Sequence, residues 1–423
     1  MPKKIRYPVY PFKLDRGGHG LLIRDLAKRL FMSQKKLECA IDEKLLILFE
    51  GIFPSARYTF TDSGKSALVV AFRAFGIGES DEVILTTFNC PAVIDAVLTV
   101  GATPVLVDIN ERFVMSLASV KRSVTKRTRA IILTHTYGFS EDDQLVNWAR
   151  SKGILMIDDA AQALFNNVNN VRCGFAGDVG ILSFGSTKPI FSLGGGCVIW
   201  KSDRDSVYSS INISTESLDQ LTQRYTGYLR ERFQLFAMSE LPEWSHVLLK
   251  KFGILPTLLN DKLDALPDRV DNAEPLLMNQ LHKQILANQL KQFKQKEEAL
   301  ALNFKLLKSS IETCCDISVV GDIVEGHGYN YFTLLFKHSG DRYRCAKYLS
   351  FKGIQTCWNY YPLHLMPIYA RFGKENPNAE KLWKLVLSIP FKPPNTADDL
   401  SYIASCVVQS MREVSNESSS VYG

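Results

Sequence analysis

The sequence has little that would direct a chain into a membrane or out of the cell. No uninterrupted apolar stretch is long enough to span a bilayer, and the first residues, Met1-Pro-Lys-Lys-Ile-Arg6, lack the apolar core of a signal peptide. We therefore predict no transmembrane segment.

Cysteine is present without the spacing of a disulfide framework or a metal site. The nine cysteines are an odd number, none are spaced as C-x-x-C, and a bridge between the adjacent Cys314 and Cys315 would be strained. This usage favours a reducing, cytoplasmic location, and no metal site is predicted.

Strong net charge is also lacking. The 50 Lys and Arg are nearly matched by 44 Asp and Glu, which leaves a formal net charge of +6. The densest basic run is typical of a solvated helix face and loop, and consists of Lys121, Arg122, Lys126, Arg127 and Arg129. Nucleic acid is therefore not an expected partner, whereas a phosphorylated small substrate would suit the surplus.

What is present is the composition of a soluble globular enzyme, with 46% hydrophobic and 22% charged residues. A chain of 423 residues can bury a large core and is expected to form two or three structural units.

The region from residue 63 to 200 alternates helical stretches with short β-rich apolar runs, the pattern of a parallel sheet covered by helices. Helices are expected over residues 66–75, 92–100, 116–124 and 142–152, and strands over 82–85, 103–108, 130–133 and 154–157. Two further strands, 179–184 and 197–200, have no full helix between them, which predicts an antiparallel element there.

Four units are expected along the chain. They are an N-terminal helical segment (1–60), a large α/β domain (61–270), a long connecting helix (271–308, most periodic over 278–300) and a smaller α+β domain (309–423). Residues 205–270 show no clear period, and no internal repeat is present.

One lysine lies where a cofactor could be held. Lys188 ends the segment Ser183-Phe-Gly-Ser-Thr-Lys188, which follows an apolar strand and precedes the flexible Leu193-Gly-Gly-Gly196. On its own this signal is modest, because a lysine after a strand is usually only solvated.

Two acids support it. Asp158 and Asp159 end a predicted parallel strand, and ligands of open α/β sheets bind outside the carboxyl ends of the strands. Pyridoxal phosphate (PLP) needs a carboxylate against its pyridine nitrogen, since the protonated ring is an electron sink. Asp159 fits that role and Asp158 would make structural hydrogen bonds; the alternative is that both acids only cap the next turn.

A possible phosphate site opens the first clear helix, at Asp62-Ser-Gly-Lys-Ser-Ala-Leu68. Backbone N–H groups at a helix N-terminus bind anions. A Walker A loop is a poor interpretation, because that motif needs a glycine where this chain has Thr59.

Phosphate site, ring-nitrogen acid and lysine occur in the order of aminotransferase-type PLP enzymes, and the chain resembles the DegT/StrS family of PLP-dependent sugar aminotransferases. The similar stretches are Ser63-Gly-Lys-Ser-Ala-Leu68, Gly76-Ile-Gly78, Asp81-Glu-Val-Ile84, Pro104-Val-Leu-Val-Asp108, His135-Thr-Tyr-Gly138, Asp159-Ala-Ala-Gln162, Gly177-Asp178, Ser183-Phe184, Thr187-Lys188 and Tyr361-Pro-Leu-His364.

The resemblance implies the fold of PLP-dependent transferases of fold type I: α/β, with a mixed, mostly parallel central sheet between helices and a smaller α+β C-terminal domain. It also implies that Lys188 forms the internal aldimine with PLP and then moves protons, and that Asp159 pairs with the pyridine nitrogen. The implied cofactor-binding set is Gly64, Lys65, Ser66, Cys90, Asp159, Gln162, Ser183 and Lys188.

Within that set, Gln162 would contact the 3-hydroxyl side of the ring, and Ser183 the phosphate together with the 64–66 turn. Tyr361 and His364 would lie near the substrate mouth or the domain interface, where a purely structural role is equally open. His135 and Tyr137 are expected to belong to the scaffold.

The chain departs from the family pattern at three places. Cys90 stands where the family has an aromatic ring over the PLP face, and Lys65 replaces a common threonine, so that its phosphate contact would come from the backbone or from added charge. The Arg-Asn-His-Gly segment, whose Asn reaches the partner's phosphate, is not recognisable in 205–270.

The expected activity is transfer of an amino group from a donor such as glutamate to a nucleotide-activated keto-sugar, in amino-sugar or polysaccharide biosynthesis. The alternatives are transamination or dehydration of a non-nucleotide ketone, and a regulator that keeps the fold without turnover. A sugar dehydratase is disfavoured because those relatives replace the lysine by histidine. A homodimer is expected from the family.

Overall fold

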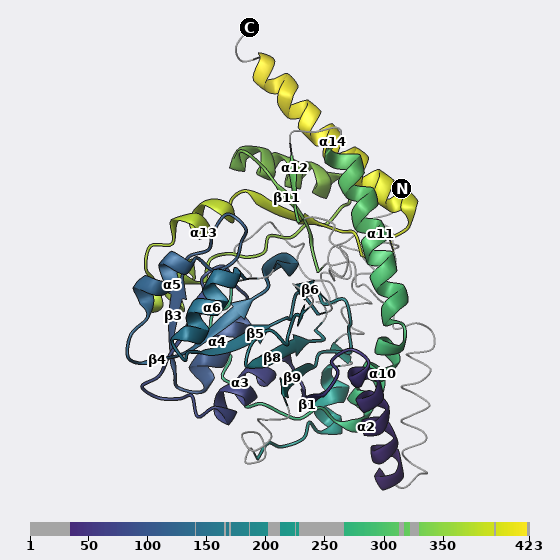
Figure 1. The fold of residues 1–423 in the computed structure, drawn as a ribbon. Helices are drawn as coiled ribbons and strands as arrows, with labels where there is room; N and C mark the ends of the chain where they lie inside the picture. Colours follow the sequence, from purple (N-terminus) through teal and green to yellow (C-terminus); the bar gives the residue numbers. More distant parts are fainter. Residues whose placement is uncertain are drawn as a thin grey trace.

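The computed structural model describes residues 34–139, 141–164, 166–168, 171–185, 187–201, 212–224, 226–227, 266–312, 317–321, 330–392 and 395–420. At their centre lies a seven-stranded sheet with the order β1-β9-β8-β5-β4-β2-β3 (Figure 1). Its strands are β1 (Ala56–Thr61), β2 (Glu82–Thr86), β3 (Thr103–Val107), β4 (Thr128–Thr134), β5 (Leu155–Asp159), β8 (Val179–Ser183) and β9 (Gly196–Lys201).

The sheet is mixed and mostly parallel, as predicted. Strands β3, β2, β4, β5 and β8 run parallel to one another, whereas β9 is antiparallel to both of its neighbours, β8 and β1. The expected antiparallel insertion after β8 is confirmed.

Helices of the predicted α/β rhythm connect the parallel strands: α3 (Gly64–Ala74), α4 (Pro91–Thr99), α5 (Leu117–Ser123) and α6 (Asp143–Ser151). Side chains of Ser63, Ser116 and Asp142 accept backbone N–H bonds at the starts of α3, α5 and α6. These helices and strands match the predicted ranges to within two residues at each end.

Both faces of the sheet are buried, which explains its continuous apolar strands. On β2, Val83 and Leu85 join the core under α3 and α4, while Ile84 joins the core under α5 and α6. The alternation follows from the two-residue period of a strand.

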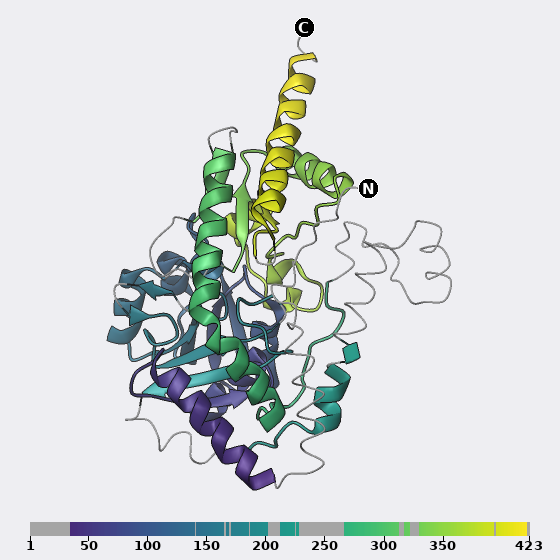
Figure 2. The same ribbon diagram turned by 90° about the vertical axis from the view of Figure 1, so that its right-hand side faces the viewer.

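The C-terminal domain contains a three-stranded antiparallel sheet of β10 (Ser318–Val320), β11 (Phe332–Leu335) and β12 (Val386–Ile389). Helices α11 (Phe293–Glu312), α12 (Ser339–Phe351) and α14 (Ala397–Ser420) pack with it around a separate apolar core. Figures 1 and 2 show α11 and α14 side by side above the large sheet.

The single long helix expected over 278–300 is wrong in detail. The structure has two helices, α10 (Gln280–Lys291) and α11, separated at Gln292. Their apolar faces lie in different cores: Leu286 of α10 is buried with the large domain, and Phe304 of α11 with the small one. The apolar pattern of residues 278–300 continues through Gln292, although its two halves pack into different cores. Nothing in the sequence therefore marks the break between the helices.

The predicted boundary at residue 60 cuts through β1, an edge strand of the large sheet. Before it lies α2 (Gln34–Glu50), which packs against α10. Residues 1–33 of the expected N-terminal segment lie outside the described residues. The remaining elements are a hairpin of β6 (Asn167–Val168) and β7 (Val171–Arg172), the 3₁₀ turns η1 (Thr136–Gly138), η4 (Leu363–Leu365) and η5 (Ala370–Phe372), and α13 (Pro377–Leu382).

None of the helices in the described ranges is long and apolar enough to cross a membrane.

Candidate active site at the carboxyl ends of β5 and β8

Lys188 and Asp159 come from neighbouring strands of the large sheet. Asp159 ends β5, and Lys188 lies on the turn that follows β8, where its backbone N–H donates to the Gly185 carbonyl at 3.0 Å. Electrostatic interactions link both side chains to each other and to Cys90. The structure thus brings together three residues predicted at the cofactor.

Burial controls the charge of this group. It lowers the pKa of Lys188, although the nearby Cys90 and Asp159 oppose the shift. Burial raises the pKa of Asp159, and the Ala161 N–H, which donates to Asp159 Oδ1 at 3.0 Å, partly offsets it. A lysine that loses its proton more readily is a better nucleophile toward an aldehyde.

Asp158 points elsewhere, because successive side chains of a strand face opposite sides. Its carboxylate makes a very short hydrogen bond with His135 Nε2 and accepts the Ala176 N–H at 2.7 Å. Burial alone would raise the pKa of Asp158, but His135 and these N–H groups outweigh it and lower the pKa. The structural role expected of Asp158 and the scaffold role of His135 agree with these contacts.

The start of α3 lies against the ends of β8 and β9. A side chain on Gly64 would place its Cβ 3.0 Å from Ser183 Cβ, which is closer than ordinary van der Waals contact, so glycine favours this close approach. Gly196 is tighter still, since its Cβ would lie 2.3 Å from the Ser63 carbonyl oxygen. The first turn of a helix has backbone N–H groups without intrahelical partners, and here it lies beside the Ser183 hydroxyl.

Side chains of this turn are already hydrogen-bonded. Ser66 Oγ donates to Asp62 Oδ1 at 2.5 Å, and the Ser66 N–H donates to Ser63 Oγ at 3.1 Å. The Lys65 ammonium donates to the Asp271 carbonyl at 2.5 Å and pairs with the Asp271 carboxylate at 3.0 Å. Of the two contacts considered for Lys65, the backbone one is therefore the better supported.

Cys90 caps the N-terminus of α4 and is partly buried. Asn89 fixes the backbone of Cys90, because Asn89 Oδ1 accepts the Cys90 N–H at 2.8 Å and Asn89 Nδ2 donates to Thr134 Oγ1, at the end of β4, at 3.0 Å.

Gln162 is buried and its side-chain amide is hydrogen-bonded at both ends. Its Oε1 accepts the Tyr137 N–H at 3.1 Å, and its Nε2 donates to the Tyr360 hydroxyl at 3.1 Å.

The two predicted substrate residues have contacts inside the protein. His364 Nδ1 lies 2.6 Å from Thr87 Oγ1 and His364 Nε2 lies 3.1 Å from Glu380, so both ring nitrogens are engaged. The Tyr361 ring packs edge-on against Trp383, with centroids 4.9 Å apart. Of the two locations considered, these contacts favour the domain interface, and a role toward substrate stays a prediction.

A model of the DegT/DnrJ/EryC1/StrS aminotransferase family matches residues 56–230 and 273–408, well over half of the chain. The chain belongs to this family. Membership confirms the expected class of enzyme, an aminotransferase, and the expected pyridoxal phosphate cofactor.

Two relatives and one solved structure illustrate the similarity. A UDP-N-acetyl-3-dehydro-α-D-glucosamine 3-aminotransferase of Acidithiobacillus ferrooxidans is 41% identical over 145 residues, which are 34% of this chain and 39% of that protein. A dTDP-4-dehydro-2,3,6-trideoxy-D-glucose 4-aminotransferase of Saccharopolyspora spinosa is 26% identical over 347 residues, 81% of each chain. The PLP form of Spr1654 from Streptococcus pneumoniae shares the fold, with a TM-score of 0.69, 17% identity and coverage of 98% and 99%.

The residues of this family member fit the cofactor. A partly buried lysine of lowered pKa interacts electrostatically with a buried carboxylate, and the helix N-terminus at Gly64 lies against Ser183 at the end of β8. Lys188 and Asp159 would hold the two ends of the ring, and the α3 start with Ser183 the phosphate. When bound, PLP supplies an electron sink for the carbanion formed at the substrate carbon.

Sequence analysis missed residues that reach the site from distant segments. Arg224 Nη1 donates to the Asp62 carbonyl at 2.7 Å and braces the α3 turn. Lys392 Nζ donates to the Thr187 carbonyl at 2.5 Å, next to Lys188. Arg224 lies in a stretch without periodicity, and Lys392 follows β12, so no local pattern indicated either contact.

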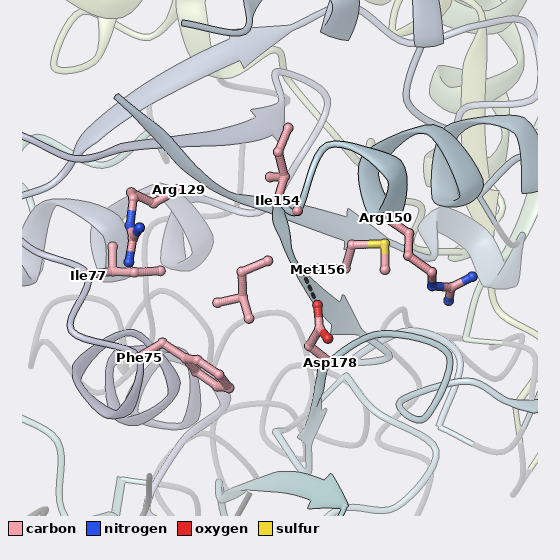
Figure 3. Close-up of a pocket in the computed structure, with 9 residues that line it drawn as sticks. Phe75, Ile77, Arg129, Arg150, Ile154, Met156 and Asp178 are labelled. Atoms are coloured by element: carbon pink, nitrogen blue, oxygen red, sulfur yellow. Dashed lines mark hydrogen bonds between the residues drawn. The ribbon is translucent and has the colours of Figure 1, made fainter. Parts of the chain in front are cut away.

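A separate cavity of about 360 Å³ lies at the amino ends of the parallel strands, opposite to the candidate active site (Figure 3). Its walls come from the amino ends of β4, β5 and β8, where Arg129, Met156 and Asp178 are found, and Asp178 accepts the Met156 N–H at 2.9 Å. Ligands of such sheets bind at the carboxyl ends, so this cavity is not the candidate active site.

Proposed function

We propose that this aminotransferase moves an amino group from an amino acid, with glutamate the expected donor, to the keto group of a nucleotide-activated sugar. Lys188 would hold PLP as a Schiff base and carry the transferred proton. The observation that carries the proposal is that Lys188, with its lowered pKa, and Asp159 lie at or after the carboxyl ends of neighbouring strands and interact electrostatically.

Each residue of the chain has a proposed task. Asp159 would keep the ring nitrogen protonated, because its carboxylate is held by the Ala161 N–H and buried away from competing water. Lys188 would act as the base that takes the proton from the donor's α-carbon, and in the second half of the reaction as the acid that gives a proton to the carbon of the aminated product.

Other residues of the site would contact the phosphate and the ring of the cofactor. The backbone N–H groups of Gly64 and Lys65, with the Ser183 hydroxyl, would bind the phosphate. A contact from Ser66 stays a prediction, because its N–H donates to Ser63 Oγ. Cys90 would pack against the ring face as a polarizable group, and Gln162 would contact its 3-hydroxyl side. Tyr361 and His364 stay predictions for the substrate mouth.

The substrate class rests on the relatives. The two named above act on UDP- and dTDP-linked keto-sugars according to their names, and the second match extends over most of both chains. A homodimer and a cytoplasmic location stay predictions.

The test uses purified protein supplied with PLP. We expect a Schiff-base absorbance that disappears on addition of L-glutamate and returns on addition of a keto-sugar nucleotide. Lys188→Ala should abolish both the absorbance and turnover, whereas Lys347→Ala, on the exposed face of α12, should change neither.

Different failures point to different alternatives. Normal turnover by Lys188→Ala would refute the role of this lysine. Loss of the absorbance with glutamate but recovery only with a non-nucleotide ketone would overturn the substrate class, and no response of the wild type to any amino donor would favour a regulator.

A further inference from the structure

Lys392 is a buried lysine that the proposed reaction does not yet use. It follows β12 in the small domain and is only 3% exposed. Its Nζ donates to the Thr187 carbonyl at 2.5 Å and to Asn330 Oδ1 at 2.9 Å, and lies 5.4 Å from the centre of the Tyr331 ring. Lysine is rarely buried unless it is paired with an acid.

No acid pairs with Lys392 in the described part of the chain. The two oxygens that it contacts belong to a backbone carbonyl and a side-chain amide, neither of which carries a charge. An isolated ammonium in a low-dielectric site is costly, so a negative group from outside the protein would be strongly favoured here.

The position of Lys392 limits which negative group that is. Thr187 is the residue before Lys188, and the charge of Lys188 acts on Lys392, so Lys392 lies near the turn to which the incoming amine would be brought. In an α-amino acid the carboxylate is attached to the carbon next to that amine. The diphosphate of a nucleotide-sugar, by contrast, lies several bonds from the keto carbon.

We propose that Lys392 binds the α-carboxylate of the amino donor, as the small domain's contribution to the donor site. This inference rests on the proposed function, since it takes Lys188 as the point where the donor amine attaches. Asn330 and the Thr187 carbonyl accept two of the three N–H groups of the Lys392 ammonium, which leaves the third for that carboxylate.

Without a bound anion, the charged form of Lys392 is disfavoured. Burial, and then the charge of Lys188, hold the pKa of Lys392 well below its usual range, and the nearby Cys357 opposes this only in part. A carboxylate at this position would favour the protonated ammonium, because an opposite charge stabilises the charged form.

The test separates the two half-reactions, because only the donor brings an α-carboxylate. Lys392→Gln keeps a hydrogen-bond donor but removes the charge, and should lower kcat/KM for L-glutamate by roughly 30-fold or more. The reaction with the keto-sugar should stay within about threefold of the wild type, and Lys392→Arg should retain most of the glutamate reaction.

A second variant keeps the lysine and guards against misfolding. Asn330→Asp places a carboxylate against Lys392, so it should compete with the donor and weaken the glutamate half-reaction while sparing the sugar half-reaction. A readout without turnover is the affinity for glutarate by calorimetry, which should fall in Lys392→Gln and in Asn330→Asp.

Equal losses in both half-reactions would overturn the inference, because a residue that only positions the Lys188 turn affects both. Unchanged glutamate kinetics and glutarate affinity in the two variants would overturn it as well. If the wild type itself forms no Schiff base with PLP, the proposed function has failed and not this inference alone.

Discussion

Gly196→Ala tests whether the approach of β9 to the start of α3 forms the phosphate site. Gly196 opens β9 and pairs with Ser183 of β8 and Thr61 of β1. An added Cβ would lie 2.3 Å from the Ser63 carbonyl oxygen and 2.7 Å from the Gly64 nitrogen. Both atoms belong to the backbone, so no side-chain rotation relieves the contact.

The size of the effect follows from these distances. A carbon and a carbonyl oxygen approach to about 3.3 Å, so the two backbones must separate by about 1 Å. Overpacking of this kind costs roughly 1–3 kcal/mol of the free energy of unfolding. A displacement of about 1 Å in a binding group can also lower turnover by roughly 10²-fold.

The assay compares thermal unfolding of the apoprotein, the dissociation constant for PLP and kcat/KM. Gly196→Ala should lose stability, bind PLP more weakly and react more slowly. Gly340→Ala is the matched control: it lies on α12 with no heavy atom within 4 Å of the added Cβ, and should be neutral or stabilising by up to about 1 kcal/mol. Wild-type PLP affinity and stability in Gly196→Ala would refute the reasoning.

Two further variants test buried carboxylates. Burial raises the pKa of Glu141 to about 8, so its stabilising contribution is present below its ordinary pKa of 4.5 and is lost as the pH rises through about 8. Glu141→Gln keeps an acceptor for the Met115 N–H. The variant should be as stable as the wild type near pH 4.5 and more stable by roughly 1–3 kcal/mol at pH 9. Parallel pH profiles of Tm for the two proteins would contradict this. Tyr369→Phe removes a 2.6 Å hydrogen bond to Asp95 and should cost roughly 1.5–3 kcal/mol in urea unfolding; a change below about 0.5 kcal/mol would contradict it.

The large domain was predictable because local signals coincide there. Each β–α unit has an apolar run of four to six residues, and side-chain caps start α3, α5 and α6 while glycines follow α3, α4 and α6. The different roles of Asp158 and Asp159 also follow from the two-residue period of a strand, once β5 is assigned, because the two side chains point to opposite faces of the sheet.

The site was only partly predictable, because some of its contacts join distant segments. Lys392 and Thr187 are 205 residues apart, and Arg224 and Asp62 are 162 apart. The Lys65 ammonium likewise turns to Asp271 rather than toward the phosphate site. Such contacts depend on how the small domain and the 212–227 segment pack, which no local pattern encodes.

The most direct test of the central claim is the site of cofactor attachment. Protein loaded with PLP is reduced with borohydride, digested and mapped by mass spectrometry. The structure predicts a pyridoxyl group on Lys188. Attachment to Lys392, to Lys65 or to no lysine at all would contradict the account.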